Sequence, residues 1–549
     1  MSTERASARR TSQANARILI ADPLNDRASA ILKEGGLNTD TQPGLSEAQL
    51  CQIIGDYDGL IVRSATTVTP KVISAGRKLK VIGRAGVGVD NIDLKAATAA
   101  GIIVQNTPLG NITSAAEHAI ALLFSHARNI PRADREMKAG KWGKKGLTGV
   151  ELSGKTIGIM GMGKVGGIVA KVALALDMTI LVFDPYLTDR KAEELRVTKT
   201  DLDTLLKESD FITVHTPLTA ETKNLINADK MKLMKKSVRI INAARGGIVN
   251  EKDLFDALKN GTIAGAALDV FETEPLAADS PLRSLDNTVL TPHLGASTEE
   301  AQERVAEDIA KQFVEFFRDG VIRNAVNLSV VLDPKIAAFA RLAETLASMA
   351  AQMARGPIVS LKVGAYGKLA EGDTRELGLC ALKGVLSRST TDPVTLVNAR
   401  SIGEARGIAL FEHKSEQVRN YANLLVVSVE TQDSDGKQAE HTIAGTCFDG
   451  QEGRIVQIEN YEIDLRPAPH LLLMFYPDRP GMIGKYGSIL GEANINIANM
   501  TVGRREKRGQ AAVALTVDEA VPQQVLEKIR AAVACDQLYS VELPNEKAM

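Results

Sequence analysis

The sequence predicts an α/β protein in which two parallel-sheet domains precede an α+β domain and a small βαββαβ module. Three observations predict this fold class. Short apolar strands alternate with helical stretches from Arg17 to about Gly295, which is typical of parallel sheets covered by helices. A glycine-rich turn at Gly161 joins one of these strands to a helix. The segment from His470 to Met549 reads strand, helix, strand, strand, helix, strand, the order of a ferredoxin-like fold.

Length and charge limit the classes of function. The chain has 549 residues, enough for three or four domains at about 150 residues each. Hydrophobic residues make up 44% and charged residues 24%, as in ordinary soluble globular proteins. The net charge of −1 provides no overall basic field for nucleic acid or an anionic membrane. Charges also interrupt every apolar stretch before it could span a bilayer. We therefore expect neither nucleic acid nor a membrane as partner.

The cysteines and the first residues bear on the cellular compartment. Four cysteines lie far apart without a C-x-x-C pair, and the seven histidines are dispersed, so we expect reduced thiols, a cytoplasmic location and no metal site. Residues 1–16 are rich in Ser, Arg and Ala and lack an apolar core, which excludes a secretory signal. We expect a disordered tail there, with an organelle transit peptide as the alternative.

The two sheets are predicted from successive strand patterns. Apolar runs begin at Arg17, Gly59, Lys80 and Gly101, and a second alternating set runs from Lys155 to about Gly295. A mostly buried helix over 114–128 is predicted to connect the two sets. A helix over 299–318 follows, with apolar residues spaced by four on one stripe. These residues are Val305, Ile309, Phe313 and Phe317.

Polar residues follow the strands of the second set. They are Asp184, His215, Asn242, Asp269 and His293. Open α/β sheets bind ligands in the crevice at the carboxyl ends of their strands. The sequence therefore predicts that this edge of the second sheet carries the chemistry.

A dinucleotide-binding motif lies in this set. A strand ends at Met160, Gly161-x-Gly163-x-x-Gly166 follows, and a helix is predicted over 167–176. Gly161 allows the tight turn, Gly163 a close backbone approach to a pyrophosphate, and Gly166 close packing of helix on strand. The pyrophosphate is expected at the helix N-terminus. Asp184 ends the next strand, where it can accept the ribose hydroxyls and repel a 2′-phosphate. We therefore expect NAD rather than NADP.

Three further residues suit the oxidation of a 2-hydroxy acid. Such a reaction needs a base for the hydroxyl proton, a cation for the carboxylate and a cofactor to take the hydride. His293 suits the base, because imidazole titrates near neutrality. Arg245 offers a planar donor matched to a carboxylate. Glu274 could stabilise the protonated imidazole.

Residues 17 to about 330 resemble the D-isomer-specific 2-hydroxyacid dehydrogenases. The matching motifs are GIMGMGKVG, NAARGG, ALDVFETEP and TPHLGAST. The resemblance implies that His293 is the acid/base, that Arg245 binds the substrate carboxylate and that Glu274 pairs with His293. It also implies that Lys164, Val165, Thr216, Ala243, Asp269 and Ala296 line the NAD site, with Asp269 holding the nicotinamide amide. The implied substrate residues are Arg63, Arg84, Val87, Gly88 and Asn111.

The second half resembles two further domains. PVTLVNA at 393–399 and GEARG at 403–407 are similar to the intervening domain of long-form D-3-phosphoglycerate dehydrogenases. YPDRPG at 476–481 and ANINI at 493–497 resemble an ACT domain, a module that commonly binds amino acids at paired interfaces. The expected boundaries are a substrate domain over 17–110 and 298–330, an NAD domain over 111–297, an intervening domain of the allosteric substrate-binding type over 335–466 and an ACT domain over 470–549.

The combination of domains implies a substrate and an effector. It implies oxidation of 3-phosphoglycerate to 3-phosphohydroxypyruvate, the first step of L-serine biosynthesis. L-Serine is the implied effector, with Tyr476, Asp478 and Asn496 as contacts. Because ACT domains usually pair, a homotetramer or homodimer is expected.

Two alternatives stay open from the sequence. A glyoxylate or D-lactate type reductase shares the catalytic motifs, although it needs no amino-acid-sensing tail. A non-enzymatic, corepressor-like NAD sensor shares the fold, but it could tolerate the loss of Glu274 or His293, and this chain keeps both.

Overall fold

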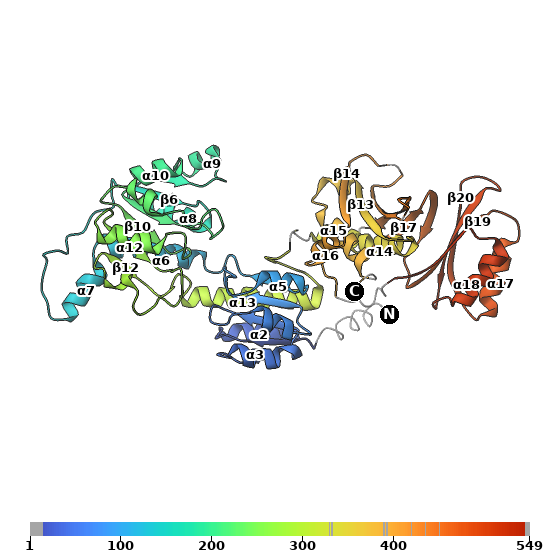
Figure 1. The fold of residues 1–549 in the computed structure, drawn as a ribbon, viewed down its shortest axis with the longest axis horizontal. Helices are drawn as coiled ribbons and strands as arrows, with labels where there is room; N and C mark the ends of the chain where they lie inside the picture. The colour runs from blue at the N-terminus through green and yellow to red at the C-terminus, as the bar shows by residue number, and fades with distance from the viewer. Residues whose placement is uncertain are drawn as a thin grey trace.

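The fold is described from a computed structural model. It describes residues 15–328, 330, 333–387, 390, 393–418, 420–433, 435–449 and 451–543. The tail expected over residues 1–16 therefore lies outside the described residues up to position 14. Four sheets follow one another along the molecule, with the second at one end and the fourth at the other (Figure 1). The predicted fold class is confirmed. In the described part of the chain, no helix combines the length and apolar character that a membrane span needs.

The first sheet is parallel, with strand order β2-β1-β3-β4-β5. Its strands are β1 (Arg17–Ile20), β2 (Asn38–Thr41), β3 (Gly59–Val62), β4 (Val81–Arg84) and β5 (Ile103–Asn106). Its helices are α2 (Asp26–Glu34), α3 (Glu47–Ile53), α4 (Pro70–Ala75), α5 (Leu94–Ala99) and the later α13 (Glu299–Asp319).

Helix α13 returns the chain to the first sheet. Thr298 caps its start and Gly320, in the left-handed region, ends it. The predicted apolar stripe is buried, and Phe313 is fully covered. A Cβ atom at Gly59 or Gly83 would lie 2.9 Å or 2.5 Å from the Phe313 ring. The absence of side chains at these two glycines therefore allows α13 to pack closely against the first sheet. This packing makes α13 part of the N-terminal domain.

The second sheet is parallel and has the order β12-β11-β10-β9-β6-β7-β8. Its strands are β6 (Thr156–Met160), β7 (Thr179–Phe183), β8 (Thr198–Lys199), β9 (Phe211–Val214), β10 (Arg239–Asn242), β11 (Gly265–Leu268) and β12 (Thr288–Leu290). Its helices are α6 (Ile112–Ala127), α7 (Ile130–Lys138), α8 (Lys164–Ala175), α9 (Asp189–Glu194), α10 (Leu202–Glu208), α11 (Ala228–Lys232) and α12 (Glu251–Lys259). The order reverses between β6 and β9, which is the switch point where such sheets bind ligands.

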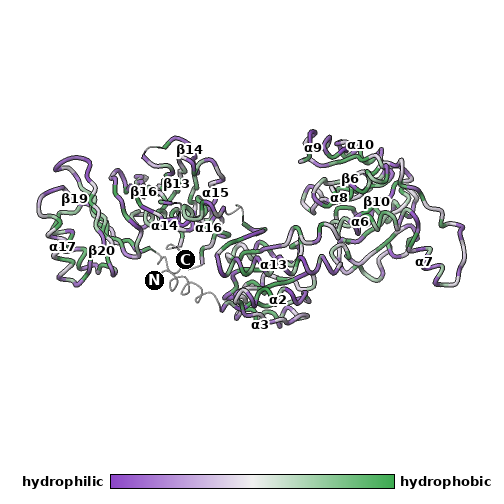
Figure 2. Tube along the Cα trace, turned by 180° about the vertical axis from the view of Figure 1, so that it is seen from behind, coloured by the Kyte–Doolittle hydropathy of each residue, from purple (hydrophilic) through white to green (hydrophobic). Residues whose placement is uncertain are grey.

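Two helices run between the first two sheets. Helix α6 begins beside the first sheet and packs against α8, β10 and β11 of the second, while α13 runs back (Figure 1). In Figure 2, hydrophobic residues are concentrated in the strands inside each domain, and hydrophilic residues are frequent in the outer helices and loops. The chain thus crosses between the first two sheets twice, once in each direction.

The third sheet is mixed, with the order β14-β13-β15-β16-β17-β18 and one parallel pair, β13 with β14. Its strands are β13 (Ile358–Gly367), β14 (Ala409–Ser415), β15 (Asn423–Gln432), β16 (Gln438–Phe448), β17 (Glu452–Ile458) and β18 (Tyr461–Leu465). Helices α14 (Ala337–Met353), α15 (Arg375–Leu386) and α16 (Ala399–Ala405) cover one face.

The fourth sheet has the order β20-β21-β19-β22, which is the ferredoxin-like arrangement. Its elements are β19 (His470–Pro477), α17 (Met482–Glu492), β20 (Ile497–Arg504), β21 (Gln510–Val517), α18 (Gln523–Val533) and β22 (Gln537–Glu542). Alternate residues of β19 face opposite ways. Leu472 and Met474 pack under the two helices, whereas Leu473 and Phe475 join the core of the third sheet. The last two domains therefore share a core.

Candidate active site

One cavity of about 920 Å³ lies at the carboxyl edges of the two parallel sheets. Its walls come from the loops after β3, β4, β10, β11 and β12 and from the start of α6. All eight residues predicted from the sequence for catalysis or substrate binding line it. They are Arg63, Arg84, Val87, Gly88, Asn111, Arg245, Glu274 and His293. Residues separated by more than two hundred positions thus meet in one place.

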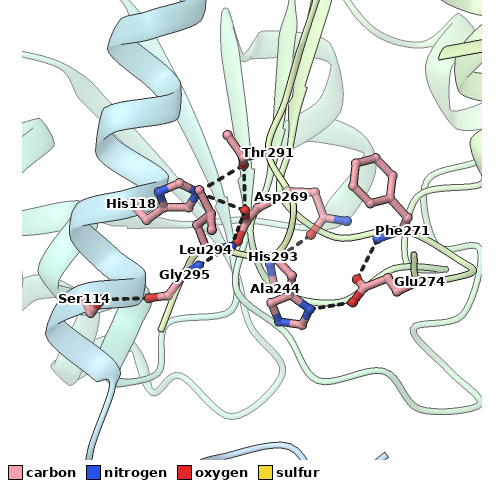
Figure 3. Close-up of polar contacts among 11 residues, drawn as sticks. Ser114, His118, Ala244, Asp269, Phe271, Glu274, Thr291, His293, Leu294 and Gly295 are labelled. Atoms are coloured by element: carbon pink, nitrogen blue, oxygen red, sulfur yellow. Dashed lines mark hydrogen bonds and ion pairs between the residues drawn. The ribbon is translucent and has the colours of Figure 1, made fainter. Parts of the chain in front are cut away.

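An imidazole and a carboxylate form a pair at the wall of this cavity. The Nδ1 atom of His293 lies 2.6 Å from Oε2 of Glu274, and the other carboxylate oxygen accepts a hydrogen bond of 3.0 Å from Phe271 N (Figure 3). Partial burial tends to raise the pKa of Glu274, but the hydrogen bonds from His293 and Phe271 outweigh it and hold the pKa below its usual value. The carboxylate therefore stays ionised at neutral pH beside an imidazole that can take up a proton.

Three of the four arginines that line this cavity are Arg63, Arg84 and Arg245. Arg245 donates to its neighbour Ala244 O at 2.6 Å and lies 3.3 Å from a carboxylate oxygen of Asp90. Arg84 is nearly covered, and burial, followed by the charges of Arg63 and Arg245, lowers its pKa to about 10. Arg84 thus keeps its charge at neutral pH. Such a cluster attracts a small anion with more than one acidic group.

The glycine turn after β6 fits a dinucleotide pyrophosphate. Gly161 has a φ of +94°, and a Cβ atom there would lie 2.8 Å from His215 O. At Gly163 no described atom lies within 4 Å of a Cβ position, whereas at Gly166 a Cβ atom would lie 2.2 Å from Gly161 O. Helix α8 begins at Lys164, three residues before the predicted start, because Gly166 packs inside its first turn. Its first N–H groups therefore point into the open space beside Gly163.

Two polar side chains beside this turn also suit NAD. The Asp184 carboxylate accepts from Met162 N at 2.7 Å and from Tyr186 N at 2.8 Å, and each oxygen keeps a lone pair for a ribose hydroxyl. Thr216 Oγ1 is buried and has no hydrogen-bond partner among the described residues. A buried hydroxyl oxygen without a protein partner is usually hydrogen-bonded to a ligand or to water. The residues present therefore fit the cofactor.

The remaining residues predicted for the NAD site lie around the same edge. Val165 and Ala243 are partly buried against the core beneath the second sheet. Ala296 lines the cavity. Lys164 is exposed at the first position of α8.

The structure shows protein contacts of Asp269 that the sequence did not predict. Its side chain is fully buried, and both carboxylate oxygens accept hydrogen bonds: Oδ1 from Thr291 and from Leu294 N, and Oδ2 from Gly295 N (Figure 3). The contact of Asp269 with the nicotinamide amide stays a prediction.

The predicted effector residues do not converge within one chain. Tyr476 is only 2% exposed, because strand alternation turns it under α17 and α18. Asp478 forms an ion pair with Arg504 at 3.3 Å, whereas Asn496 precedes β20 at the opposite end of the sheet. The strand register separates the two by about 25–30 Å.

Sequence reasoning missed two charged residues of the cavity. Asp90 contacts Arg245, and Arg283 lines the cavity while it donates to the carbonyls of Leu276 and Ala277. Asp90 ends the glycine-rich run AGVGVD at 85–90, and that run was the one available signal. For Arg283 the sequence offers no signal, since its position depends on the turn after Pro275.

Three family models match successive parts of the chain. Residues 120–295 match the D-isomer specific 2-hydroxyacid dehydrogenase, NAD binding domain. Residues 335–459 match the D-3-phosphoglycerate dehydrogenase intervening domain, and residues 470–534 match the ACT domain. The NAD match covers the glycine turn and the segment of His293.

Individual relatives match almost the whole chain. A D-3-phosphoglycerate dehydrogenase of Synechocystis is 43% identical over 96% of this chain and 95% of its own length. One of Archaeoglobus fulgidus is 44% identical over 93% and 97%. Among solved structures, the D-lactate dehydrogenase of Aquifex aeolicus in complex with NAD and lactic acid is 30% identical, with a TM-score of 0.50 over 55% of this chain and 96% of that one.

Proposed function

Because the chain belongs to the D-3-phosphoglycerate dehydrogenase family, we propose that it oxidises D-3-phosphoglycerate to 3-phosphohydroxypyruvate with NAD, the first step of L-serine biosynthesis. One observation supports this most directly. The His293–Glu274 pair and the three arginines line a single cavity, beside a glycine turn that fits a dinucleotide. A proton acceptor and a site for two anionic groups thus lie together, as a phosphorylated 2-hydroxy acid requires.

Different arginines are assigned to the two anionic groups of the substrate. Arg245 holds the substrate carboxylate, because a guanidinium offers two parallel donors. Arg63 and Arg84, which come from the first sheet, hold the phosphate, with Val87, Gly88 and Asn111 shaping the pocket. Two anionic ends bound by different arginines fix the orientation of the carbon between them.

His293 accepts the hydroxyl proton. Its Nδ1 atom is engaged with Glu274, which leaves Nε2 to face the substrate. The carboxylate stabilises the imidazolium that forms. When bound, NAD takes up the hydride from the same carbon. Closure of the two domains around the cavity would exclude water from this transfer.

The same proposal assigns the cofactor residues. Gly161, Gly163 and Gly166 accommodate the pyrophosphate at the start of α8, Asp184 the ribose, and Thr216 a further polar group. Lys164, Val165, Ala243 and Ala296 are proposed to line the site through backbone or apolar contacts. Asp269 is proposed to hold the nicotinamide amide, through the oxygen that accepts a single hydrogen bond from the protein.

We propose L-serine as the effector, bound between two copies of the C-terminal module. Asp478 and Asn496 lie at opposite ends of one sheet, so an antiparallel pair of modules would bring Asp478 of one copy near Asn496 of the other. An exposed apolar surface on α17 and the edge strand β20 supports such pairing. Its members are Ile483, Met500 and Val502, exposed by 50%, 38% and 41%.

A second exposed surface supports a homo-oligomer, a dimer or a tetramer. In helix α7 none of the described side chains is buried, and the helix extends away from its domain (Figure 1). The segment 130–142 carries three exposed apolar side chains, Ile130, Met137 and Trp142, which are exposed by 51%, 51% and 83%. Exposed apolar side chains on one segment favour contact with another subunit. Sedimentation equilibrium of the wild type and of Trp142→Ser tests this, since a monomeric wild type contradicts it.

We also propose a cytoplasmic location. All four cysteines are free in the described chain, as a reducing compartment favours. Fractionation of cells that express the tagged full-length chain tests this, because recovery in an organelle would support the transit-peptide alternative instead.

The test of the proposed activity is NADH formation at alkaline pH. The assay compares 3-phosphoglycerate with D-lactate, glycolate and 2-hydroxyglutarate, each with and without millimolar L-serine. Turnover of 3-phosphoglycerate that serine suppresses supports both the substrate and the effector. Turnover of an unphosphorylated acid alone contradicts the substrate, and activity unchanged by serine contradicts the effector.

A further inference from the structure

A buried carboxylate organises the segment that carries His293. The Oδ1 atom of Asp269 accepts from Thr291 Oγ1 at 2.6 Å and from Leu294 N at 2.7 Å, and Oδ2 accepts from Gly295 N at 2.8 Å (Figure 3). The Asp269 carbonyl also accepts from His293 N at 2.9 Å. One residue at the end of β11 thus anchors nearly the whole segment Thr291–Gly295.

Helix α6 anchors the same segment from the other side. His118 Nε2 lies 3.0 Å from Asp269 Oδ1 and 3.2 Å from Thr291 Oγ1. Ser114, one turn earlier on the same helix face, donates to Gly295 O at 2.8 Å. Figure 3 shows both side chains projecting from α6 toward the segment. Two residues of one helix therefore fix the carboxylate and the backbone that it binds.

The backbone of His293 needs such support. Its φ is +54°, in the left-handed region that residues with a Cβ atom seldom occupy. Such a conformation persists only where its surroundings determine it. The conformation also directs the imidazole toward Glu274. Looser anchoring of the segment would therefore displace the proton acceptor.

The charge of Asp269 makes His118 important. Burial tends to raise the pKa of Asp269, but the hydrogen bonds from His118, Thr291 and Leu294 N outweigh it and keep the pKa below its usual value. Two described side chains contact this carboxylate, Thr291 and His118, and His118 is the one that comes from α6. An ionised carboxylate that is fully buried is costly once one of its hydrogen-bond donors is removed.

We propose that His118 is a positioning residue for the reaction: through Asp269 it fixes the segment that presents His293. His118 does not line the cavity, so it acts through other groups and not on the substrate. Helix α6 begins beside Asn111, on the substrate side of the cavity. His118 thus links the helix that joins the two domains to the proton acceptor. The inference rests on the proposed dehydrogenase activity.

The test compares His118→Phe with His118→Gln in the full-length protein. Phe keeps the ring and removes the donor, whereas Gln places an N–H at a similar reach without charge. For Phe we expect kcat to fall about 10- to 100-fold, with KM for 3-phosphoglycerate and Kd for NADH within about threefold. Gln is expected to restore most of kcat. The matched control is His126→Phe on the same helix, where the imidazole contacts Asn287 O instead; its kcat should stay near wild type.

Hydrogen–deuterium exchange gives a second readout that needs no turnover. The peptide covering 288–297 should exchange faster in His118→Phe and at the wild-type rate in His126→Phe. Wild-type kcat in His118→Phe overturns the inference, as does a loss of NADH affinity as large as the loss of kcat. If His118→Phe does not fold, Ser114→Ala replaces it, with an expected three- to tenfold loss of kcat and faster exchange of the same peptide. A wild-type protein that turns over no 2-hydroxy acid contradicts the proposed function. The exchange rates of the peptide covering 288–297 then show by themselves whether His118 anchors this segment.

Discussion

His293 and Glu274 lie 2.6 Å apart, between Nδ1 and Oε2, although they follow different strands of the second sheet. Phe271 N also donates a hydrogen bond of 3.0 Å to Glu274, so the position of the carboxylate does not depend on the imidazole alone. The imidazole remains 45% exposed toward the cavity. Glu274 thus orients the imidazole through Nδ1, which leaves Nε2 for the proton transfer proposed above.

Replacement of each member of this pair should have a different effect. His293→Ala removes the proton acceptor and should lower kcat by about 10²- to 10⁴-fold, with Kd for NADH nearly unchanged. Glu274→Gln keeps a hydrogen-bond acceptor but loses the charge, so a smaller loss is expected. Steady-state kinetics together with NADH fluorescence titration measures both. A non-enzymatic scaffold would bind NADH equally in both variants and would show no turnover to lose.

Arg63 should select for the phosphate. It follows β3 of the first sheet and lines the cavity, whereas Arg245 follows β10 of the second sheet. Arg63→Met should therefore reduce kcat/KM for 3-phosphoglycerate by at least about tenfold, as expected for the loss of a charge-assisted bond. The control is an unphosphorylated 2-hydroxy acid, for which the same variant should change kcat/KM little. Equal losses on both substrates would mean that Arg63 holds the carboxylate or supports the fold instead.

Replacement of two adjacent glycines of α8 by alanine should have different effects on stability. At Gly166 a Cβ atom would meet Gly161 O at 2.2 Å, so Gly166→Ala should destabilise the domain by about 1–3 kcal/mol and weaken NAD binding. At Gly167 no described atom lies within 4 Å, so Gly167→Ala should be neutral or stabilise by up to about 1 kcal/mol. Thermal unfolding and NADH titration check both. A similar response of the two variants contradicts the tight packing.

Asp184 should set the preference for NAD over NADP. Its carboxylate binds Met162 N at 2.7 Å and lies where the ribose is expected, so it repels a 2′-phosphate. Asp184→Ser should weaken NAD binding. It should also lower the ratio of kcat/KM for NAD to kcat/KM for NADP by about tenfold or more. The control is Asp189→Ser, on the exposed start of α9, which should leave the ratio unchanged. An unchanged ratio in Asp184→Ser places the ribose elsewhere.

The imidazole of His215 should make stability depend on pH. Burial lowers its pKa to about 4, whereas a histidine of the unfolded chain titrates near about 6.5. Between these values the unfolded chain binds a proton that the folded chain does not. The free energy of unfolding should therefore fall as the pH drops from 6.5 to 4, by up to about 3 kcal/mol, and stay constant above 6.5. Urea unfolding of the wild type and of His215→Gln across this range checks the slope, which the variant should reduce.

Much of the site could be predicted from local patterns. The glycine turn follows from a strand, three glycines and a later aspartate, because each backbone requirement acts within a few residues. The stripe of α13 follows in the same way from side chains spaced by four. Polar residues at successive strand ends indicated the edge of the sheet, since parallel strands place their carboxyl ends together.

Contacts across the fold could not be predicted in this way. The sequence predicted Asp269 as a cofactor contact, but it did not predict that Leu294 N and His118 contact the same carboxylate. It placed Tyr476 at an effector, but the alternation of β19 turns that side chain inward. Both outcomes depend on which element packs on which face, and local spacing does not specify that.

By itself, the sequence predicted the fold class, the dinucleotide turn and three residues that line one cavity, His293, Glu274 and Arg245. These features depend on residue type and on periodicities of a few positions. Only the tertiary structure decided that Asp269 supports the His293 segment, that Asp90 pairs with Arg245, and that Asp478 and Asn496 lie at opposite ends of one sheet. The reason is physical: burial and charge pairing arise between segments far apart in the chain, and their geometry exists only once the sheets and helices have packed.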